Sequence, residues 1–184
     1  MSLKRRITTC VALLRGVNLG GNKMVPMADL RAMLADLGFA DPRTLLQSGN
    51  AVFGARTRAS TRVERMLERA VAQRLDLDVD VFVRTAREWR DLIAANPFTD
   101  EARGEPSRLL VFFLRKAPDA AAVRTLEGAI RGRERIRAAG AQLYVVYPDG
   151  QGRSKFTHTV VEKHLGTRAT GRNWNTITKL AAML

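Results

Sequence analysis

The segment from residue 15 to residue 23 combines glycines with cationic and amide side chains directly before a predicted helix. The residues with this chemistry are Arg15, Asn18, Gly20, Gly21 and Lys23. Glycines allow backbone N–H groups to converge on an anion, and the start of a helix adds a partial positive charge. The spacing matches neither the phosphate-binding pattern G-x-x-x-x-G-K-[ST] nor the dinucleotide pattern G-x-G-x-x-G. The segment therefore predicts either an anion-binding loop or a tight reversal in which the glycines supply a positive φ.

A second loop, residues 149–155, repeats this design between a predicted strand and a predicted helix. Arg153 and Lys155 flank Ser154, which we expect to cap that helix. Two basic glycine loops favour an anion site more than one does, although a glycine before a helix is common.

Two further polar clusters are candidates for the same site. Gln47, Ser48 and Asn50 stand at a strand junction, where they either form a turn or orient a ligand beside the first loop. The second role requires the turn and the loop to lie at one end of a sheet. Arg172 and Asn173 precede a tryptophan at a predicted helix start, where they either cap and pack that helix or close the site.

Catalytic and metal-binding patterns are poor. His158 and Glu162 share one face of a predicted helix while His164 is turned away, so we expect no metal site. The single cysteine, Cys10, lies in an apolar run and is interpreted as a small buried hydrophobe. No catalytic residue and no cofactor can be named, and enzymatic activity stays open.

The charge of the chain favours anionic partners in general. Lys and Arg number 31 against 18 acidic residues, a net charge of +13, which predicts non-specific attraction to polyanions. Most of the basic residues are arginines, a bias that a GC-rich genome also produces. If the segment from Arg133 is a strand, then Arg133, Arg135 and Arg137 point to one face and repel one another unless acids or phosphates lie opposite. That face is either a polyanion surface or a solubilising edge strand.

The order of predicted elements is β-α-β-β-α-β plus a helix in residues 1–96. In residues 108–184 it is β-α-β-β-α plus a helix, with or without a short last strand near Arg168. Residues 97–107, with two prolines and no periodicity, are expected to form a linker. This order predicts an α+β fold of two ferredoxin-like halves, each an antiparallel sheet with helices on one face, followed by a C-terminal helix. No apolar run approaches the length of a membrane helix and no export signal is evident, so we expect a cytoplasmic protein and no membrane partner.

Four segments carry a family resemblance: LLRGVNLGGNKMVPMADLRAMLADLGF, LLQSGNAVF, YPDGQGRSKF and RNWNTITKLAAM. Together they resemble the bacterial family catalogued as domain of unknown function 1697, over nearly the whole chain. The resemblance implies two ferredoxin-like halves and brings no activity, cofactor or catalytic residue.

The function that the residues favour is binding of a phosphorylated small molecule or nucleotide. Arg15, Asn18 and Lys23 would contact the anion, with the polar turn at residues 47–50 orienting the ligand. A nucleic-acid-binding module is the main alternative, although only 6% of the residues are aromatic and no strand shows the aromatic pair of an RNA-recognition motif. A small enzyme and a protein-interaction scaffold also remain open, and the sequence does not indicate an oligomeric state.

Overall fold

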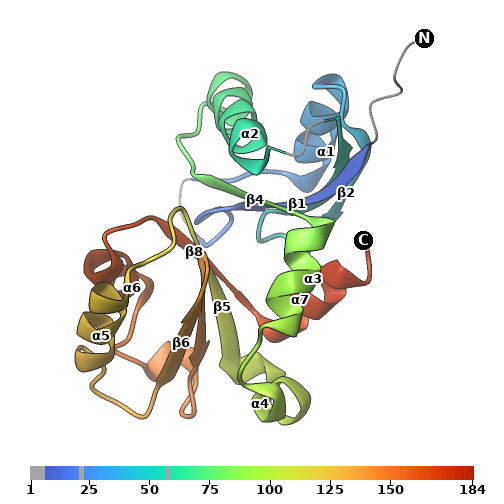
Figure 1. Cartoon of the computed structure of the whole chain (residues 1–184). Coiled ribbons are helices and arrows are strands. Elements are labelled where there is room, and N and C mark those ends of the chain that lie inside the picture. The colour runs from blue at the N-terminus through green and yellow to red at the C-terminus, as the bar shows by residue number, and fades with distance from the viewer. Residues whose placement is uncertain (1–6, 21–22, 57–58) are drawn as a thin grey trace. The chain divides into compact units, whose positions relative to one another are not determined.

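The computed structural model describes residues 7–20, 23–56 and 59–184. Two four-stranded antiparallel sheets occur, with strand orders β2-β3-β1-β4 and β6-β7-β5-β8 (Figure 1). Each order places the first strand of its half in the middle of the sheet. The predicted α+β fold with two ferredoxin-like halves is therefore confirmed.

The first half contains four strands and two helices. They are β1 (Thr8–Leu14), α1 (Met27–Asp36), β2 (Ala40–Leu45), β3 (Asn50–Ala55), α2 (Ser60–Leu75) and β4 (Val81–Thr85). Residues of both helices join one hydrophobic core with Cys10, Ala12 and Leu14 of β1. The period-two pattern of β1 thus directs alternate side chains towards α1 and α2.

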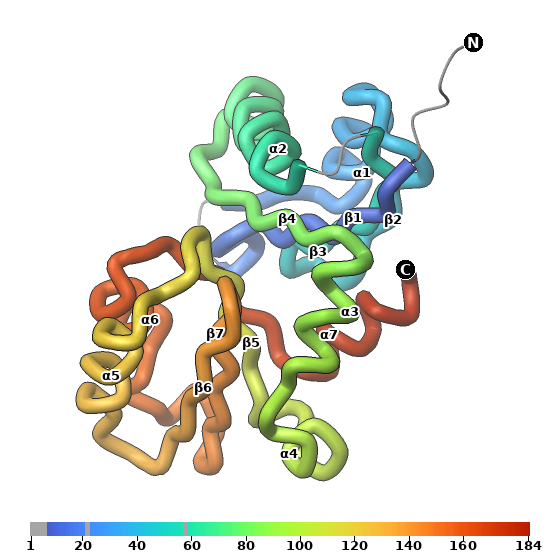
Figure 2. Tube along the Cα trace, in the orientation of Figure 1, coloured from blue at the N-terminus to red at the C-terminus, as the bar shows by residue number. Residues whose placement is uncertain are grey.

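The second half repeats this arrangement. Its elements are β5 (Leu109–Leu114), α5 (Ala120–Gly128), β6 (Arg135–Ala139), β7 (Gln142–Val146), α6 (His158–Leu165) and β8 (Ala169–Asn173). Figure 2 shows α5 and α6 side by side, and their residues form one core with Leu110, Phe112 and Leu114 of β5.

The opposite face of each sheet is also buried. Val11 and Leu13 of β1, and Val111 and Phe113 of β5, are at most 1% exposed. Strands buried on both faces are near-continuous apolar runs, which explains the sequences of β1 and β5. In the second half, the Tyr144 hydroxyl on this opposite face donates a hydrogen bond to the carbonyl oxygen of Leu92.

A helix follows the last strand of each half: α3 (Ala86–Ala94) after β4, and α7 (Trp174–Ala181) after β8. The start of α3 is a capping box, because the Thr85 N–H donates to Glu88 Oε2 at 2.7 Å and the Glu88 N–H donates to Thr85 Oγ1 at 3.2 Å. The chain divides into two compact units, Met1–Arg90 with Leu180–Leu184, and Asp91–Lys179. The divisions therefore fall within α3 and α7.

Residues 97–107, which we expect to form a linker, contain a helix, α4 (Thr99–Gly104), and the start of a 3-10 turn, η1 (Pro106–Arg108). Two other local expectations need correction. The alternation of apolar and acidic residues in LDVDVFV, residues 77–83, predicts a strand there, but strand β4 begins only at Val81. Helix α6 is capped by the Thr157 hydroxyl, not by Ser154, which precedes it after a 3-10 turn, η2 (Gln151–Arg153). Across the described part of the chain, no helix has the length and apolar character needed to cross a bilayer.

Candidate functional site

Asn18 joins the first glycine loop to the turn at residues 47–50. Its Nδ2 donates to the carbonyl oxygens of Val25 and Gln47, at 2.9 and 2.6 Å, and its Oδ1 accepts from the Val25 N–H at 2.8 Å. The loop and the turn therefore lie at one end of the first sheet, as the ligand hypothesis required. These hydrogen bonds to the backbone nevertheless already use the side-chain amide of Asn18.

The turn itself is held by local contacts. The Asn50 side chain is fully buried and donates from Nδ2 to the Leu45 carbonyl and to Ser48 Oγ, each at 2.9 Å. Gly49 has φ +74°, and a Cβ there would lie 2.6 Å from Val17 Cγ2, so this close approach admits only glycine. Ser48 and Asn50 therefore serve the turn, and the Gln47 side chain stays exposed.

The two cations of the first loop face acidic residues. Arg15 Nη1 lies 3.9 Å from Asp80 Oδ2, and Lys23 Nζ donates to the backbone carbonyl of Asp78. The Asp80 carboxylate beside Arg15 opposes the approach of a phosphate, and the Lys23 ammonium group is bound to a backbone carbonyl. Gly20 is exposed with φ +77°, and Gly21 lies outside the described residues.

The second loop and the end of β8 belong to the other compact unit. Arg153 and Lys155 are exposed, while the Ser154 hydroxyl between them donates to a Glu134 carboxylate oxygen. Arg172 is buried and donates from Nη1 to Thr170 Oγ1 and the Gly171 carbonyl, at 2.9 and 2.8 Å. Burial lowers its pKa to about 10.

Asn173 caps α7 by accepting the Thr176 N–H at 3.0 Å. The tryptophan that follows it, Trp174, is 6% exposed and fills the core. Both features agree with the interpretation in which this segment caps and packs the helix.

The alternating arginines have acidic partners. Arg133 Nη1 lies 3.6 Å from Asp149, Arg137 Nη1 lies 3.8 Å from Glu127, and Arg135 pairs with Glu101 while covering the Phe98 ring at 5.3 Å. Only Arg135 and Arg137 belong to the strand. The repulsion expected between these guanidinium groups is relieved within the chain itself, which favours the edge-strand interpretation.

His158 and Glu162 share a helix face, as predicted, and they fix α6 to β8. His158 Nε2 hydrogen-bonds the Ala169 carbonyl, and Glu162 Oε1 accepts the Ala169 N–H at 2.7 Å. Among the described residues, no group of three or more His, Cys, Asp or Glu side chains is placed to hold a metal ion. Burial, followed by the charge of Glu88, raises the pKa of the Cys10 thiol to about 11, so Cys10 is no activated nucleophile.

Both acidic side chains of α2 point towards the edge strand β4. Glu68 Oε1 accepts the N–H of Val81 at 3.0 Å, and Glu64 Oε1 accepts the N–H of Val83 at 2.9 Å. Glu64 also lies 3.7 Å from Arg84 Nη1. The outward N–H groups of an edge strand need such acceptors. Both carboxylates of α2 are therefore bound on the side of the helix that faces β4.

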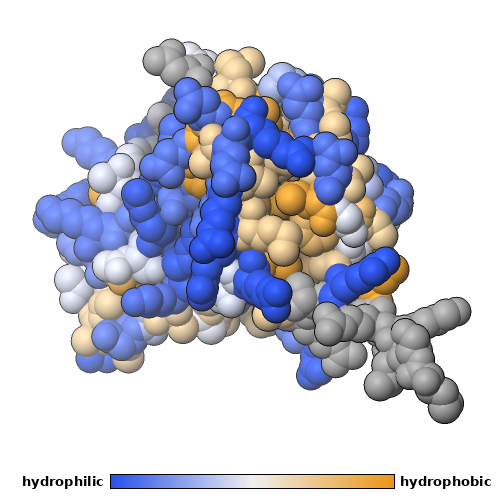
Figure 3. All heavy atoms as spheres, turned by 90° about the horizontal axis from the view of Figure 1, so that it is seen from above, coloured by the Kyte–Doolittle hydropathy of each residue, from blue (hydrophilic) through white to orange (hydrophobic). Residues whose placement is uncertain are grey.

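The outer side of α2 carries an arginine-lined groove of about 590 Å³ beside the end of α1. We call it the arginine groove, and its lining residues are Leu37, Thr61, Arg62, Arg65, Met66, Arg69, Ala70 and Gln73. Figure 3 shows hydrophilic side chains in a stripe next to an apolar area on this face of the first half. Among the residues that the structure describes, no acidic side chain lines the groove.

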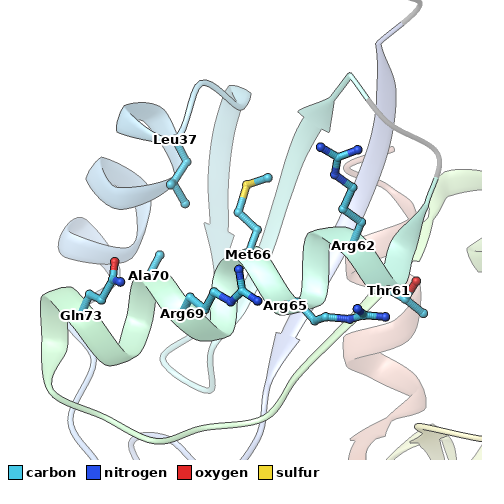
Figure 4. Close-up of a pocket in the computed structure, with 8 residues that line it drawn as sticks. All are labelled: Leu37, Thr61, Arg62, Arg65, Met66, Arg69, Ala70 and Gln73. Carbon is cyan, nitrogen blue, oxygen red and sulfur yellow. The ribbon is translucent and has the colours of Figure 1, made fainter.

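Three arginines line this groove. Arg62, Arg65 and Arg69 are exposed, and within the described residues none of them forms an ion pair. They lie about 4.5 and 6 Å apart along the helix axis and within about 60° around it. Figure 4 shows Leu37 and Met66 between these arginines and α1. A row of unpaired guanidinium groups is suited to phosphate oxygens, which it binds by charge and by paired N–H donors.

The sequence contains a signal for this groove that the motifs considered above do not include. Arginines at positions i, i+3 and i+7 mark one side of a helix, whereas the glycine loops drew attention by composition. The decisive fact, that Glu64 and Glu68 of the same helix face inward, depends on the position of β4.

Residues 7–144 match the family described as "Protein of unknown function (DUF1697)". The chain belongs to this family. The resemblance inferred from the four segments is thereby confirmed, and the DUF1697 match extends through the first half into β7 of the second. A search of the curated proteins finds no match.

A solved structure shares the DUF1697 chain's fold. It is described as the structure of the conserved bacterial protein SP0830 from Streptococcus pneumoniae, with a TM-score of 0.75 and 20% sequence identity. The match covers 97% of this chain and 99% of that chain. At this identity the likeness shows the common fold and carries no activity across.

Proposed function

We propose that the protein binds a phosphorylated small molecule, a nucleotide included, and that the arginine groove holds its phosphate groups. The observation that supports this proposal is the row formed by Arg62, Arg65 and Arg69 in a groove without acidic lining. The glycine loops offer less, because Asn18 and Asn50 hold the backbone and Arg15 faces Asp80.

The energetics of α2 support a ligand at this row. Arg62 and Arg65 stand at i, i+3, and Arg65 and Arg69 stand at i, i+4, so like charges are neighbours on the helix. Such pairs destabilise a helix by a few tenths of a kcal/mol each. A bound phosphate replaces this repulsion with attraction. The empty site therefore lowers the free energy of unfolding, and a bound ligand raises it.

The size of the groove agrees with a small ligand. Its volume of about 590 Å³ lies within the range of roughly 300–1,000 Å³ typical of small-molecule sites. The groove has an apolar side and a cationic side, which suits a ligand that has both an apolar and an anionic group.

Nucleic acid is the second candidate, favoured by the net charge of +13 and by the linear arrangement of the arginines. The two candidates differ in their response to salt. Binding of a nucleic acid releases many counterions and weakens steeply as salt rises, whereas a small phosphate compound contacts few cations and loses less affinity.

Isothermal titration calorimetry with inorganic tripolyphosphate at 0.15 M salt tests the proposal. We expect Arg65→Ala and Arg69→Ala each to weaken binding about tenfold, because a hydrogen bond to a charged group contributes about 1.5–3 kcal/mol. Arg124→Ala is the matched control, since it removes another exposed arginine, from helix α5 of the other unit. Equal losses in all three variants would show that only the net charge of the chain attracts the anion.

A further inference from the structure

The arginine groove has different chemistry on its two sides and at its two ends. Arg65 and Arg69 form one side, while Leu37, Met66 and Ala70 form the other (Figure 4). Because charged and apolar surfaces run side by side, inorganic phosphate alone would leave the apolar side exposed to water. The ligand that fills the groove therefore carries an apolar group next to its phosphates.

Gln73 lies at the end of the groove remote from Arg62. Residues 62 and 73 are roughly 16 Å apart along the helix axis. Gln73 is exposed, and its amide has no hydrogen-bond partner within the described residues. An amide offers one acceptor and two donors, the complement of the polar edge of a heterocyclic ring.

The apolar side is short and shallow. Only Leu37, Met66 and Ala70 contribute, and Leu37 and Met66 stay partly exposed. A long flexible hydrocarbon would find too little surface here, whereas a flat ring can lie against the Met66 thioether and the Leu37 side chain. This difference favours a ring with a polar edge over an aliphatic chain.

We infer that the arginine groove binds a nucleoside diphosphate or triphosphate. Arg62, Arg65 and Arg69 hold the phosphates, Met66 and Leu37 cover one face of the base, and Gln73 hydrogen-bonds its edge. The inference rests on the proposed function, since it assigns the ligand class of the same site.

The test compares inorganic tripolyphosphate with the four ribonucleoside triphosphates by calorimetry at 0.15 M salt. We expect at least one nucleoside triphosphate to bind about tenfold tighter than tripolyphosphate, the smallest gain typical of an added group in an apolar site. Gln73→Ala and Met66→Ala should remove most of that gain and leave tripolyphosphate affinity within about twofold of the unmodified chain. Met66→Leu, which keeps the apolar contact, should retain it.

Gln151→Ala is the control, because Gln151 is an exposed glutamine in the other unit. Equal affinity for tripolyphosphate and all four nucleoside triphosphates would overturn the inference and leave the proposed function standing. Tighter binding of an isoprenyl diphosphate than of any nucleoside triphosphate would also overturn it. If neither tripolyphosphate nor any nucleotide binds, the proposed function fails as well.

Discussion

Both tyrosines of the chain, Tyr144 and Tyr147, are buried, and their hydroxyls donate to backbone carbonyls of Leu92 and Phe156. Burial raises the pKa of Tyr144 to about 12. Burial, and next the charge of Glu134, raises the pKa of Tyr147 as well. An ionised phenolate has no solvation in these positions, so the native state favours the neutral form.

The tyrosines predict how stability changes in alkali. Their native pKa values lie above the unfolded value of about 10, so their contribution is complete below pH 10 and is lost as pH rises from there towards 12. Absorbance at 295 nm should therefore show no tyrosinate until tryptophan fluorescence reports unfolding. Tyrosinate that forms near pH 10 in a chain that is still folded would contradict the burial of these side chains.

Single residues also show where sequence reasoning succeeds and where it stops. The capping box of Thr85 and Glu88 is local, so the spacing of a threonine and a glutamate three residues apart is enough to indicate it. Asn18 lies beside the turn, a condition that the ligand hypothesis required, but its amide binds the Gln47 carbonyl, a contact across 29 residues that composition cannot reveal. A polar side chain that holds two loops together has the same residue type as one that holds a ligand.

At the scale of elements, each half has an edge strand whose N–H groups donate hydrogen bonds to side chains of the preceding helix. Glu64 and Glu68 on α2 accept N–H groups of β4, and Glu162 on α6 accepts the Ala169 N–H of β8. The order of elements was predictable because hydrophobic periodicity is local. The hydrogen bonds from these glutamates were not predictable, because they depend on which strand lies at the edge of each sheet.

The two carboxylates of α2 differ in burial, which predicts different costs of removal. Glu64 is 4% exposed and pairs with the buried Arg84, so Glu64→Ala should lower the free energy of unfolding by about 3–5 kcal/mol. Glu68 is partly exposed, so Glu68→Ala should cost only about 1 kcal/mol. Urea denaturation of both variants measures the difference, and an equal or smaller loss for Glu64→Ala would contradict the inner-side role of this carboxylate.

At the scale of the whole molecule, the net charge of +13 attracts any polyanion, so affinity alone does not identify a site. Pairing within the chain reduces the contribution of many arginines, as Arg135 with Glu101 illustrates. Burial tends to raise the pKa of the Glu101 carboxyl, but the hydrogen bond and the charge of Arg135 outweigh it and lower that pKa below its usual value. On the outer side of α2, Arg62, Arg65 and Arg69 form no such ion pair within the described residues, and we propose that the ligand binds there.

The most direct test of that placement is a map of backbone amide shifts by ¹H–¹⁵N NMR during titration with inorganic tripolyphosphate at 0.15 M salt. Salt at this level screens exposed charges beyond about 8 Å, so general attraction contributes little to localised shifts. We predict shifts concentrated in residues 61–73 and at Leu37. Shifts concentrated instead at residues 15–20 or 149–155, or spread evenly over the surface, would contradict binding at the arginine groove.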